Sequence, residues 1–178
     1  MEWSNHLKMN SLTLNFGINN EYDLFNKLKR DLDKLLNEAS IDEHTKTIDN
    51  TYNFLITAYH LSYDWTKNAK YKRKNEIIPD SFKDLLTAIR FLANCSKHRE
   101  LTRDLAKNTV DNVTEPIVAD YWTYVYGNQI NITINGKQES LILLSEPLMK
   151  YFEWLLDDSK TLDEMPDEVK NFRLMETE

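Results

Sequence analysis

The sequence predicts a mainly α-helical protein with a small antiparallel β appendage, that is, an up-down helical bundle followed by a β-hairpin and a C-terminal helix. Apolar residues recur at helical spacing in three segments before residue 105, and the period changes to two after residue 119. Asn135-Gly136 is typical of a hairpin turn, because both positions of that turn favour positive φ. We expect one domain over 1–178, with a helical core at 20–105, a hairpin-plus-helix extension at 119–158 and an acidic tail at 159–178.

Three amphipathic helices are expected in the first part of the chain. The first begins at Glu21; its apolar positions are Tyr22, Phe25, Leu28, Leu32, Leu35 and Leu36, and its outer positions are Asp23, Lys27, Arg30 and Asp31. The second starts near residues 40–43 and runs for about six turns, with apolar positions Ile48, Tyr52, Leu55, Tyr59 and Trp65. The third is capped by Pro79-Asp80-Ser81 and continues towards Leu105, with core positions Phe82, Leu85, Leu86, Ile89, Leu92 and Ala93.

The remaining segments give weaker patterns. A short strand is expected at 11–16 and a loop at 108–118, and the alternating residues of the second half predict strands at 121–126, 130–134 and 137–144. A last amphipathic helix begins at Ser145-Glu146-Pro147. The acidic residues that follow are expected to form a short helix or a loose tail.

Composition excludes several classes of function. The formal net charge of -7 argues against broad, nonspecific attraction to nucleic acid and leaves a confined basic patch as the way to contact RNA. Cys95 is the single cysteine, which rules out an intrachain disulfide and a multi-cysteine zinc site. Three glycines are too few for a P-loop or a dinucleotide fingerprint. No cofactor, metal or membrane contact is expected, and a cytoplasmic location is the prediction.

The end of the third helix carries a candidate catalytic stripe. Residues four apart on a helix are displaced by only about 40° around its axis, so Arg90, Asn94 and His98 share one side, with Lys97 one turn beyond Arg90. Such a stripe suits a phosphodiester, because Arg or Lys binds the nonbridging oxygens and His moves a proton near neutral pH. The structural alternative is that these cations simply complement the negative end of the helix dipole.

A second polar pair lies at the end of the preceding helix. His60 and Asp64 are four residues apart, so the carboxylate is placed to orient the imidazole. Alternatively, Asp64 pairs with Arg90 or Lys97 in a purely structural contact.

The most basic run of the chain, residues 67–76, is a candidate RNA-binding segment. Its candidate residues are Lys70, Lys72, Arg73 and Lys74. Cations interleaved with Tyr71 suit a phosphate backbone and one stacked base. The alternative is an ordinary solvated loop.

The two helix ends together resemble a known family. A long helix ending His60-Leu61-Ser62-Tyr63-Asp64-Trp65 and a helix ending Ala93-Asn94-Cys95-Ser96-Lys97-His98 are similar to the HEPN-like helical bundles of bacteria and their phages, over roughly 20–105. The hairpin and final helix look like an extension found in bacterial relatives. Catalytic members are metal-independent ribonucleases whose motif is an Arg, four to six further residues and then a His, commonly with a polar residue directly after the Arg, and two subunits join their motifs around RNA. Other members are noncatalytic binding or toxin–antitoxin modules.

The resemblance implies roles for individual residues. Asn94 matches the polar position of the family motif and His98 the terminal His, whereas the Arg position falls on Ala93, and seven residues separate Arg90 from His98. The implied function is RNA binding or targeting in a toxin, defence or phage setting, with a homodimer as the assembly. If the protein is an enzyme, it is a metal-independent endoribonuclease with His98 as general acid–base, Arg90 or Lys97 as phosphate clamp and Asn94 orienting the substrate. The alternative is a noncatalytic module whose hairpin edge or acidic tail binds a partner protein.

Overall fold

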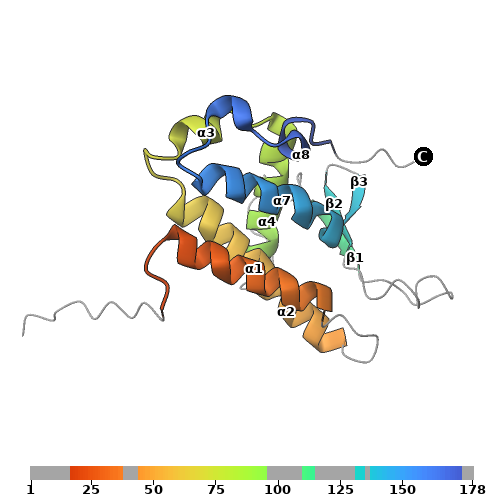
Figure 1. Cartoon of the computed structure of the whole chain (residues 1–178). Helices are drawn as coiled ribbons and strands as arrows, with labels where there is room; N and C mark the ends of the chain where they lie inside the picture. The colour runs from red at the N-terminus through yellow and green to blue at the C-terminus, as the bar shows by residue number, and fades with distance from the viewer. Residues whose placement is uncertain (1–16, 38–43, 96–109, 115–130, 135–136, 174–178) are drawn as a thin grey trace, which may run out of the picture.

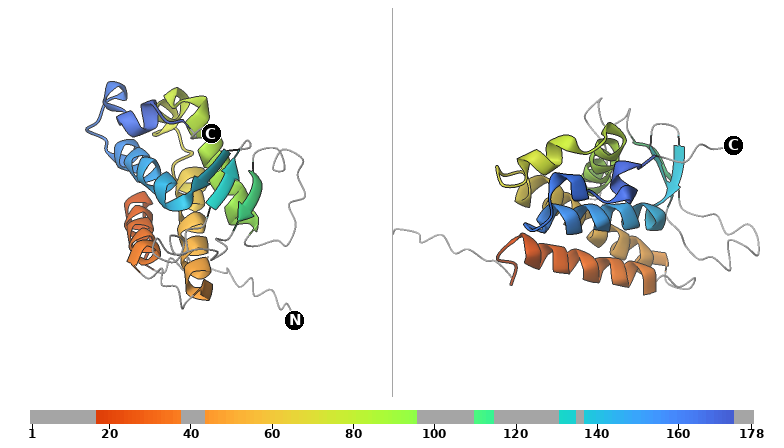
Figure 2. Two further views of the ribbon diagram at one scale, coloured as in Figure 1. Left: turned by 90° about the vertical axis from the view of Figure 1, so that its right-hand side faces the viewer. Right: turned by 45° about the horizontal axis from the view of Figure 1, so that its top comes forward.

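The protein is mainly helical with a small antiparallel sheet, as the sequence predicts (Figure 1). The computed structural model describes residues 17–37, 44–95, 110–114, 131–134 and 137–173. The long helices are α1 (Glu21–Asn37), α2 (His44–His60), α4 (Asp80–Cys95) and α7 (Leu141–Leu156). The short ones are the π-helical turn η1 (Leu61–Trp65), α3 (Lys72–Ile77), the 3₁₀ turn η2 (Leu162–Glu164) and α8 (Asp167–Lys170). The sheet lies at one end of the bundle, beside α4 and α7 (Figure 2).

Helix α1 starts where the sequence predicts, because its first turn is capped from both sides. The Asn20 side chain accepts a hydrogen bond from the Asp23 backbone N–H at 2.9 Å, and the Asp23 carboxylate accepts one from the Asn19 backbone N–H at 2.9 Å. The predicted core positions Tyr22 and Leu36 are in fact 43% and 47% exposed. The buried apolar face of α1 consists of Leu24, Phe25, Leu28 and Leu35.

A polar contact between α1 and α2 corrects the prediction that Asp31 lies on the outer face. Asp31 is buried. Its Oδ2 accepts hydrogen bonds from Lys27 Nζ at 2.5 Å and from Thr57 Oγ1 at 2.6 Å, and Lys27 Nζ also donates to Thr57 Oγ1 at 2.6 Å. The buried carboxylate is therefore neutralised and hydrogen-bonded, which is the condition for placing a charge in the interior. We call these three residues the α1–α2 triad.

The second and third predicted helices form the centre of the bundle. Helix α2 runs directly into η1, which gives the long helix expected from the sequence. Tyr52, predicted to be in the core, is 41% exposed, and Leu86 of α4 is half-buried. The buried face of α2 and η1 consists of Thr51, Phe54, Leu55, Thr57, Ala58 and Leu61. Thr51 and Thr57 are polar residues on this buried face. They interrupt its apolar pattern in the sequence, so the predicted apolar face of the helix was displaced from the buried one.

The sheet has the strand order β1-β2-β3, with β1 (Val110–Thr114), β2 (Asn131–Ile134) and β3 (Lys137–Ser140). The loop predicted at 108–118 is wrong for β1, which pairs antiparallel with β2 across an irregularity in register between Val110 and Asn112. The β2–β3 pairs bracket residues 135–136, which confirms the predicted hairpin. The strands predicted at 11–16 and 121–126 lie outside the described residues.

Helix α7 begins at Leu141, not at Ser145, so the predicted strand over 137–144 is half its expected length. The apolar run at 141–144 is compatible with either structure, because a short continuous apolar run does not distinguish strand from helix. Pro147 lies inside the helix. Proline has no backbone N–H, so Pro147 cannot donate to the Leu143 carbonyl. Leu143 is 57% exposed, which places it within reach of water.

The segment after α7 packs onto the core as short helical elements, the first of the two expected alternatives. Met165, Val169 and Phe172 are buried, and Phe172 meets Phe82 edge-on with ring centroids 5.4 Å apart. Trp154 Nε1 donates to the Thr161 carbonyl at 2.9 Å. This part of the predicted acidic tail is therefore integral to the bundle.

The α1–α2 triad predicts a specific loss of stability. Replacing Thr57→Val removes a hydroxyl that bonds both charged partners, so the free energy of unfolding should fall by about 1–3 kcal/mol. Thr87→Val on α4 is the control, because its hydroxyl only donates to the Lys83 carbonyl of the same helix at 2.8 Å. Urea denaturation of both variants checks this. Equal midpoints for the two variants would contradict a role of the triad in joining α1 to α2.

Candidate functional site

The candidate site lies where the end of α2 meets α4, and it contains an unusual helical turn. Over η1 the backbone makes i→i−5 hydrogen bonds, with Thr66 N donating to the Leu61 carbonyl at 3.1 Å. The Thr66 hydroxyl reinforces this turn by donating to the same carbonyl at 2.8 Å. Single π turns inside α-helices are rare and occur frequently at functional sites.

Arg90, the predicted phosphate-binding cation, is held by an aromatic side chain of the π turn. Its guanidinium donates a hydrogen bond to the Tyr63 hydroxyl, and its Cζ lies 4.3 Å from the centroid of the Tyr63 ring. Lys67 Nζ lies 4.9 Å from the same ring. Arg90 Nε is buried, and among the described residues none accepts a hydrogen bond from it. Arg90 as a whole is half-buried and has no carboxylate partner among the described residues, so its charge is left to attract an incoming anion.

The predicted His60–Asp64 pair forms one face of the same turn. His60 Nδ1 and Asp64 Oδ2 are 2.5 Å apart, so Asp64 contacts His60, whereas Arg90 donates to Tyr63. Both side chains of the pair are substantially exposed, at 38% and 52%. A carboxylate at Nδ1 favours the tautomer in which Nε2 is the acceptor. Tyr59 lies between the two groups of contacts, stacked on Tyr63 with centroids 5.7 Å apart.

The structure brings together part of the predicted catalytic stripe. Asn94 follows Arg90 by one turn of α4 and is half-buried. Lys97 and His98 lie outside the described residues. We call the described group Tyr59, His60, Tyr63, Asp64, Lys67, Arg90 and Asn94 the α2–α4 surface. The sequence pattern indicated the His60–Asp64 pair but not Tyr63 as the partner of Arg90, because this contact joins two helices.

The predicted RNA-binding cations divide into two groups. Lys74 donates to the carbonyls of Trp154 at 2.7 Å and Asp157 at 2.8 Å, and thereby caps the C-terminus of α7. Lys70 lies 3.0 Å from Asp158 and 3.5 Å from Glu21. These two lysines therefore join the basic run to α1 and α7.

Lys72 and Arg73, by contrast, are exposed on α3, and Lys72 lies 3.7 Å from Glu76 in a surface ion pair. Such pairs contribute little to stability. Of the four predicted cations, Lys72 and Arg73 are the ones whose heads are available to an external ligand.

Burial and hydrogen bonding shift the pKa of several groups around the basic run. Burial lowers the pKa of Lys74 despite the nearby Asp157. A hydrogen bond from the Tyr71 hydroxyl, 2.5 Å from Glu21 Oε1, lowers the pKa of Glu21. Burial, followed by the contact with Glu21, raises the pKa of Tyr71 to about 12. The fold is therefore most stable when the Glu21 carboxylate is ionised and the Tyr71 phenol is neutral.

The sequence reasoning missed a basic face on α1. Lys27, Arg30 and Lys34 line a groove of about 480 Å³ along this helix, together with Asp23 and Asp31. Their spacing of three and four residues is a signal that the sequence contains, but Arg30 was interpreted only as part of a solvated outer face.

Comparison of the chain with protein-family models, with curated proteins and with solved structures finds no match. Within the described ranges, His, Cys, Asp and Glu side chains form no group of three or more that could hold a metal ion. None of the helices in these ranges is long and apolar enough to cross a membrane.

The capping role of Lys74 predicts a difference between neighbouring cations. Lys74→Gln should lower the free energy of unfolding by about 1–2 kcal/mol, because two carbonyls at the end of α7 lose a charged donor. Arg73→Gln should change it by less than about 0.5 kcal/mol, as is usual for an exposed position. Urea midpoints measure both. A loss of the same size in both variants would rule out the capping role.

The Glu21–Tyr71 hydrogen bond predicts a pH-dependent stability. The pKa of Glu21 is lowered on folding, so the bond stabilises the protein above the unfolded value of 4.5 and the contribution is lost as pH falls through the folded pKa. Tyr71→Phe should therefore cost about 1–2 kcal/mol at pH 7 and much less near pH 3. Because the pKa of Tyr71 is raised, wild type should also lose stability above about pH 10, and Tyr71→Phe should lose less there. Urea denaturation of wild type and Tyr71→Phe at pH 3, 7 and 11 tests both the acid and the alkaline effect. The same difference in unfolding free energy at all three pH values would refute them.

Proposed function

We propose that this chain is a HEPN-like helical bundle that binds RNA on its α2–α4 surface. The observation that carries the proposal is the environment of Arg90: its side chain is half-buried, its guanidinium lies over the Tyr63 ring, and it has no carboxylate partner among the described residues. Arginine in this state offers a planar set of donors to a phosphate without first leaving a carboxylate partner.

The aromatic groups beside Arg90 give a reason to favour RNA over a free anion. Tyr59 and Tyr63 are stacked next to the His60 ring, whose centroid is 5.0 Å from that of Tyr59. A run of partly exposed rings beside cations is the usual platform for unpaired bases, because every base has a face that stacks. Lys67 adds a second positive charge at the same ring.

Roles in cleavage follow from the family resemblance and belong to the same proposal. His98 would act as general acid–base, Arg90 or Lys97 as phosphate clamp, and Asn94 would orient the substrate. Arg90 lies one turn before Ala93, the position that matches the family Arg, and this spacing favours substrate binding over full catalytic power. A homodimer that joins two α2–α4 surfaces would lengthen the RNA-binding site.

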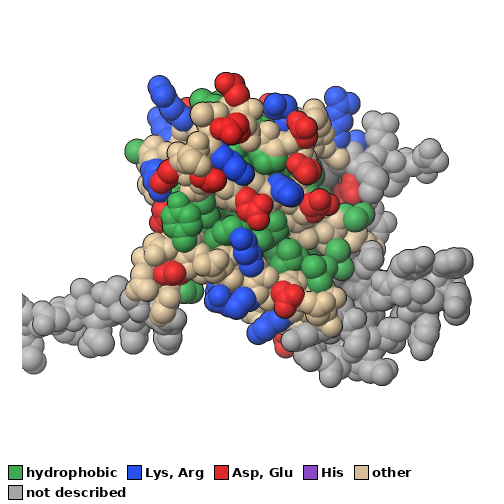
Figure 3. Space-filling view, viewed as in Figure 1, with side chains coloured by type: hydrophobic (Ala, Val, Ile, Leu, Met, Phe, Trp, Pro, Cys, Tyr) green, Lys and Arg blue, Asp and Glu red, His purple; other side chains and the backbone are tan. Residues whose placement is uncertain are grey.

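Binding of a protein is the second candidate function, and a specific surface favours it. Leu36 of α1 and Leu143 of α7 are 47% and 57% exposed, on two helices that contact each other. Apolar side chains follow the boundary between these helices in the space-filling view (Figure 3). Contiguous apolar patches commonly mark sites of protein contact. RNA binding that is tight and salt-sensitive would favour the first function over this one.

The RNA proposal predicts a defined effect at Arg90. Wild type should bind a fluorescein-labelled single-stranded RNA of mixed sequence, measured by anisotropy at 50 mM salt in a chelator, and Arg90→Gln should weaken binding about tenfold, close to one lost charge-assisted contact. Arg173→Gln, an exposed cation elsewhere on the protein, is the control. Urea midpoints confirm that each variant is folded.

Two results would overturn parts of this proposal. Arg90→Gln binding like wild type, or no RNA binding by wild type, would refute RNA binding at the α2–α4 surface. For cleavage, the same RNA is incubated with wild type and with His98→Ala. Equal cleavage by both proteins, or cleavage by neither, rules out the nuclease role while leaving binding to be judged by anisotropy.

A further inference from the structure

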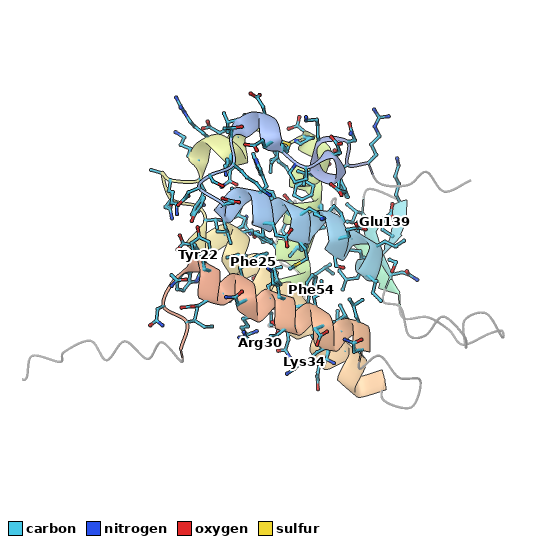
Figure 4. All side chains as sticks on the ribbon, viewed as in Figure 1. Tyr22, Phe25, Arg30, Lys34, Phe54 and Glu139 are labelled. Atoms are coloured by element: carbon cyan, nitrogen blue, oxygen red, sulfur yellow. The ribbon has the colours of Figure 1, made fainter. Side chains whose placement is uncertain are left out.

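The groove on α1 carries cations that the fold does not use. It is open along the helix and has a volume of about 480 Å³, within the usual range for ligand sites. The labelled side chains Arg30 and Lys34 lie along the edge of α1 away from α7 (Figure 4), and blue side chains gather along this edge in Figure 3. We call this surface the α1 groove.

The carboxylates of the α1 groove are already engaged. Asp31 is neutralised by Lys27 within the α1–α2 triad, and its second donor is the Thr57 hydroxyl. Asp23 accepts from the Asn19 backbone at the start of the helix. Both carboxylates therefore have a structural role, and Lys27 already forms an ion pair with Asp31.

Arg30 and Lys34 remain as the available charges of the groove. Both are exposed, and neither side chain forms a hydrogen bond or ion pair with another of the described residues; Lys34 accepts a hydrogen bond only at its backbone carbonyl, from the Asn50 side chain. They are four residues apart on α1, so their side chains are neighbours on one face, with about 6 Å between them along the axis. In a chain of net charge -7, two adjacent cations without carboxylate partners are a local site of positive potential.

We propose that the α1 groove binds phosphate groups of an RNA strand, with Arg30 and Lys34 as the contacts; this rests on the proposed RNA-binding function and extends it. Arg30 offers two parallel N–H donors to the oxygens of one phosphate, and Lys34 contacts the next group as a point charge. Asn26, also in the groove lining, adds an uncharged amide beside them.

Helix α2 connects the α1 groove to the α2–α4 surface. Thr57 of α2 contacts Lys27 in the groove wall, and His60 and Tyr63 follow on the next turns of the same helix. Because α1 and α4 both pack against α2, an RNA strand that stacks a base near Tyr63 has Arg90 on one neighbouring helix and Arg30 on the other. The same phosphate chemistry is also present in free polyphosphates, so the experiment includes both sources.

The test measures the salt dependence of RNA binding in the double variant Arg30→Gln/Lys34→Gln. Loss of two phosphate contacts should lower the magnitude of the slope of log Kd against log salt by about 1.4, and weaken binding about tenfold at 50 mM salt. Lys150→Gln/Lys170→Gln is the matched control, because it removes the same charge from exposed positions on α7 and α8. Its slope should equal that of wild type.

Calorimetry with sodium tripolyphosphate distinguishes failure of this inference from failure of the proposed function. RNA binding that depends on Arg90 but is equal in the double variant and the control overturns the α1 groove as an RNA contact and leaves the proposed function standing. Tripolyphosphate binding lost in the double variant, with no RNA binding by wild type, overturns the RNA assignment of both sites. RNA binding with the reduced slope supports the inference, and equal slopes in all proteins overturn it.

Discussion

The position of α1 against α2 depends on the buried contact of Lys27, Asp31 and Thr57. A carboxylate in the interior is strongly destabilising unless it is paired and hydrogen-bonded, so α1 and α2 have one favourable register, in which Thr57 reaches Asp31. Apolar packing alone would tolerate sliding by small steps, because Leu and Phe side chains adapt to neighbouring positions. The polar contact thus fixes which face of α1 remains on the surface, and with it the cations of the α1 groove.

The basic run at 67–76 has an equally specific structural role at the other end of α1. Tyr71 is almost fully buried and its hydroxyl reaches Glu21 in the first turn of α1, while Lys74 caps the last turn of α7. One short segment therefore joins the start of α1 to the end of α7, where Tyr22 also donates to the Leu156 carbonyl at 2.5 Å. A cluster of charged residues in a sequence can therefore connect helices of the fold. Here the contacts of Lys70 and Lys74 distinguish this structural role from ligand binding.

Local patterns predicted the elements whose determinants lie within a few residues. The helical spacing of α1 and α4, the Asn135-Gly136 hairpin and the His60–Asp64 contact all belong to this class. The burial of Asp31 was not predictable in this way, because its partner Thr57 is 26 residues away in the sequence. The start of α7 was missed because an apolar run suits either kind of structure, and β1 because its Asp-Asn centre resembles a loop.

The candidate site also combines features set by nearby residues with features set by residues distant in the sequence. Residues of one helix, such as Arg90 and Asn94, could be placed on a common face from their spacing alone. The surroundings of these residues could not be predicted, because Tyr63 reaches Arg90 from a π turn that the Thr66 backbone and hydroxyl close by donating to the Leu61 carbonyl. This threonine thus reinforces the turn from which the Tyr63 side chain leaves the helix, and no periodic pattern reports this.

An acidic protein can bind RNA only where its negative charges are held away from the contact surface or neutralised. At physiological salt the field of an exposed charge is screened within about 8 Å, so the potential at a phosphate is set by its immediate neighbours and not by the net charge of -7. On the described surface, Asp31 is neutralised by Lys27, Asp64 is held by His60, and Asp157 and Asp158 lie beside Lys74 and Lys70. Arg30, Lys34 and Arg90 are left without carboxylate partners among the described residues. The distribution of ion pairs, more than the balance of charge, is therefore what makes phosphate recognition physically consistent with this composition.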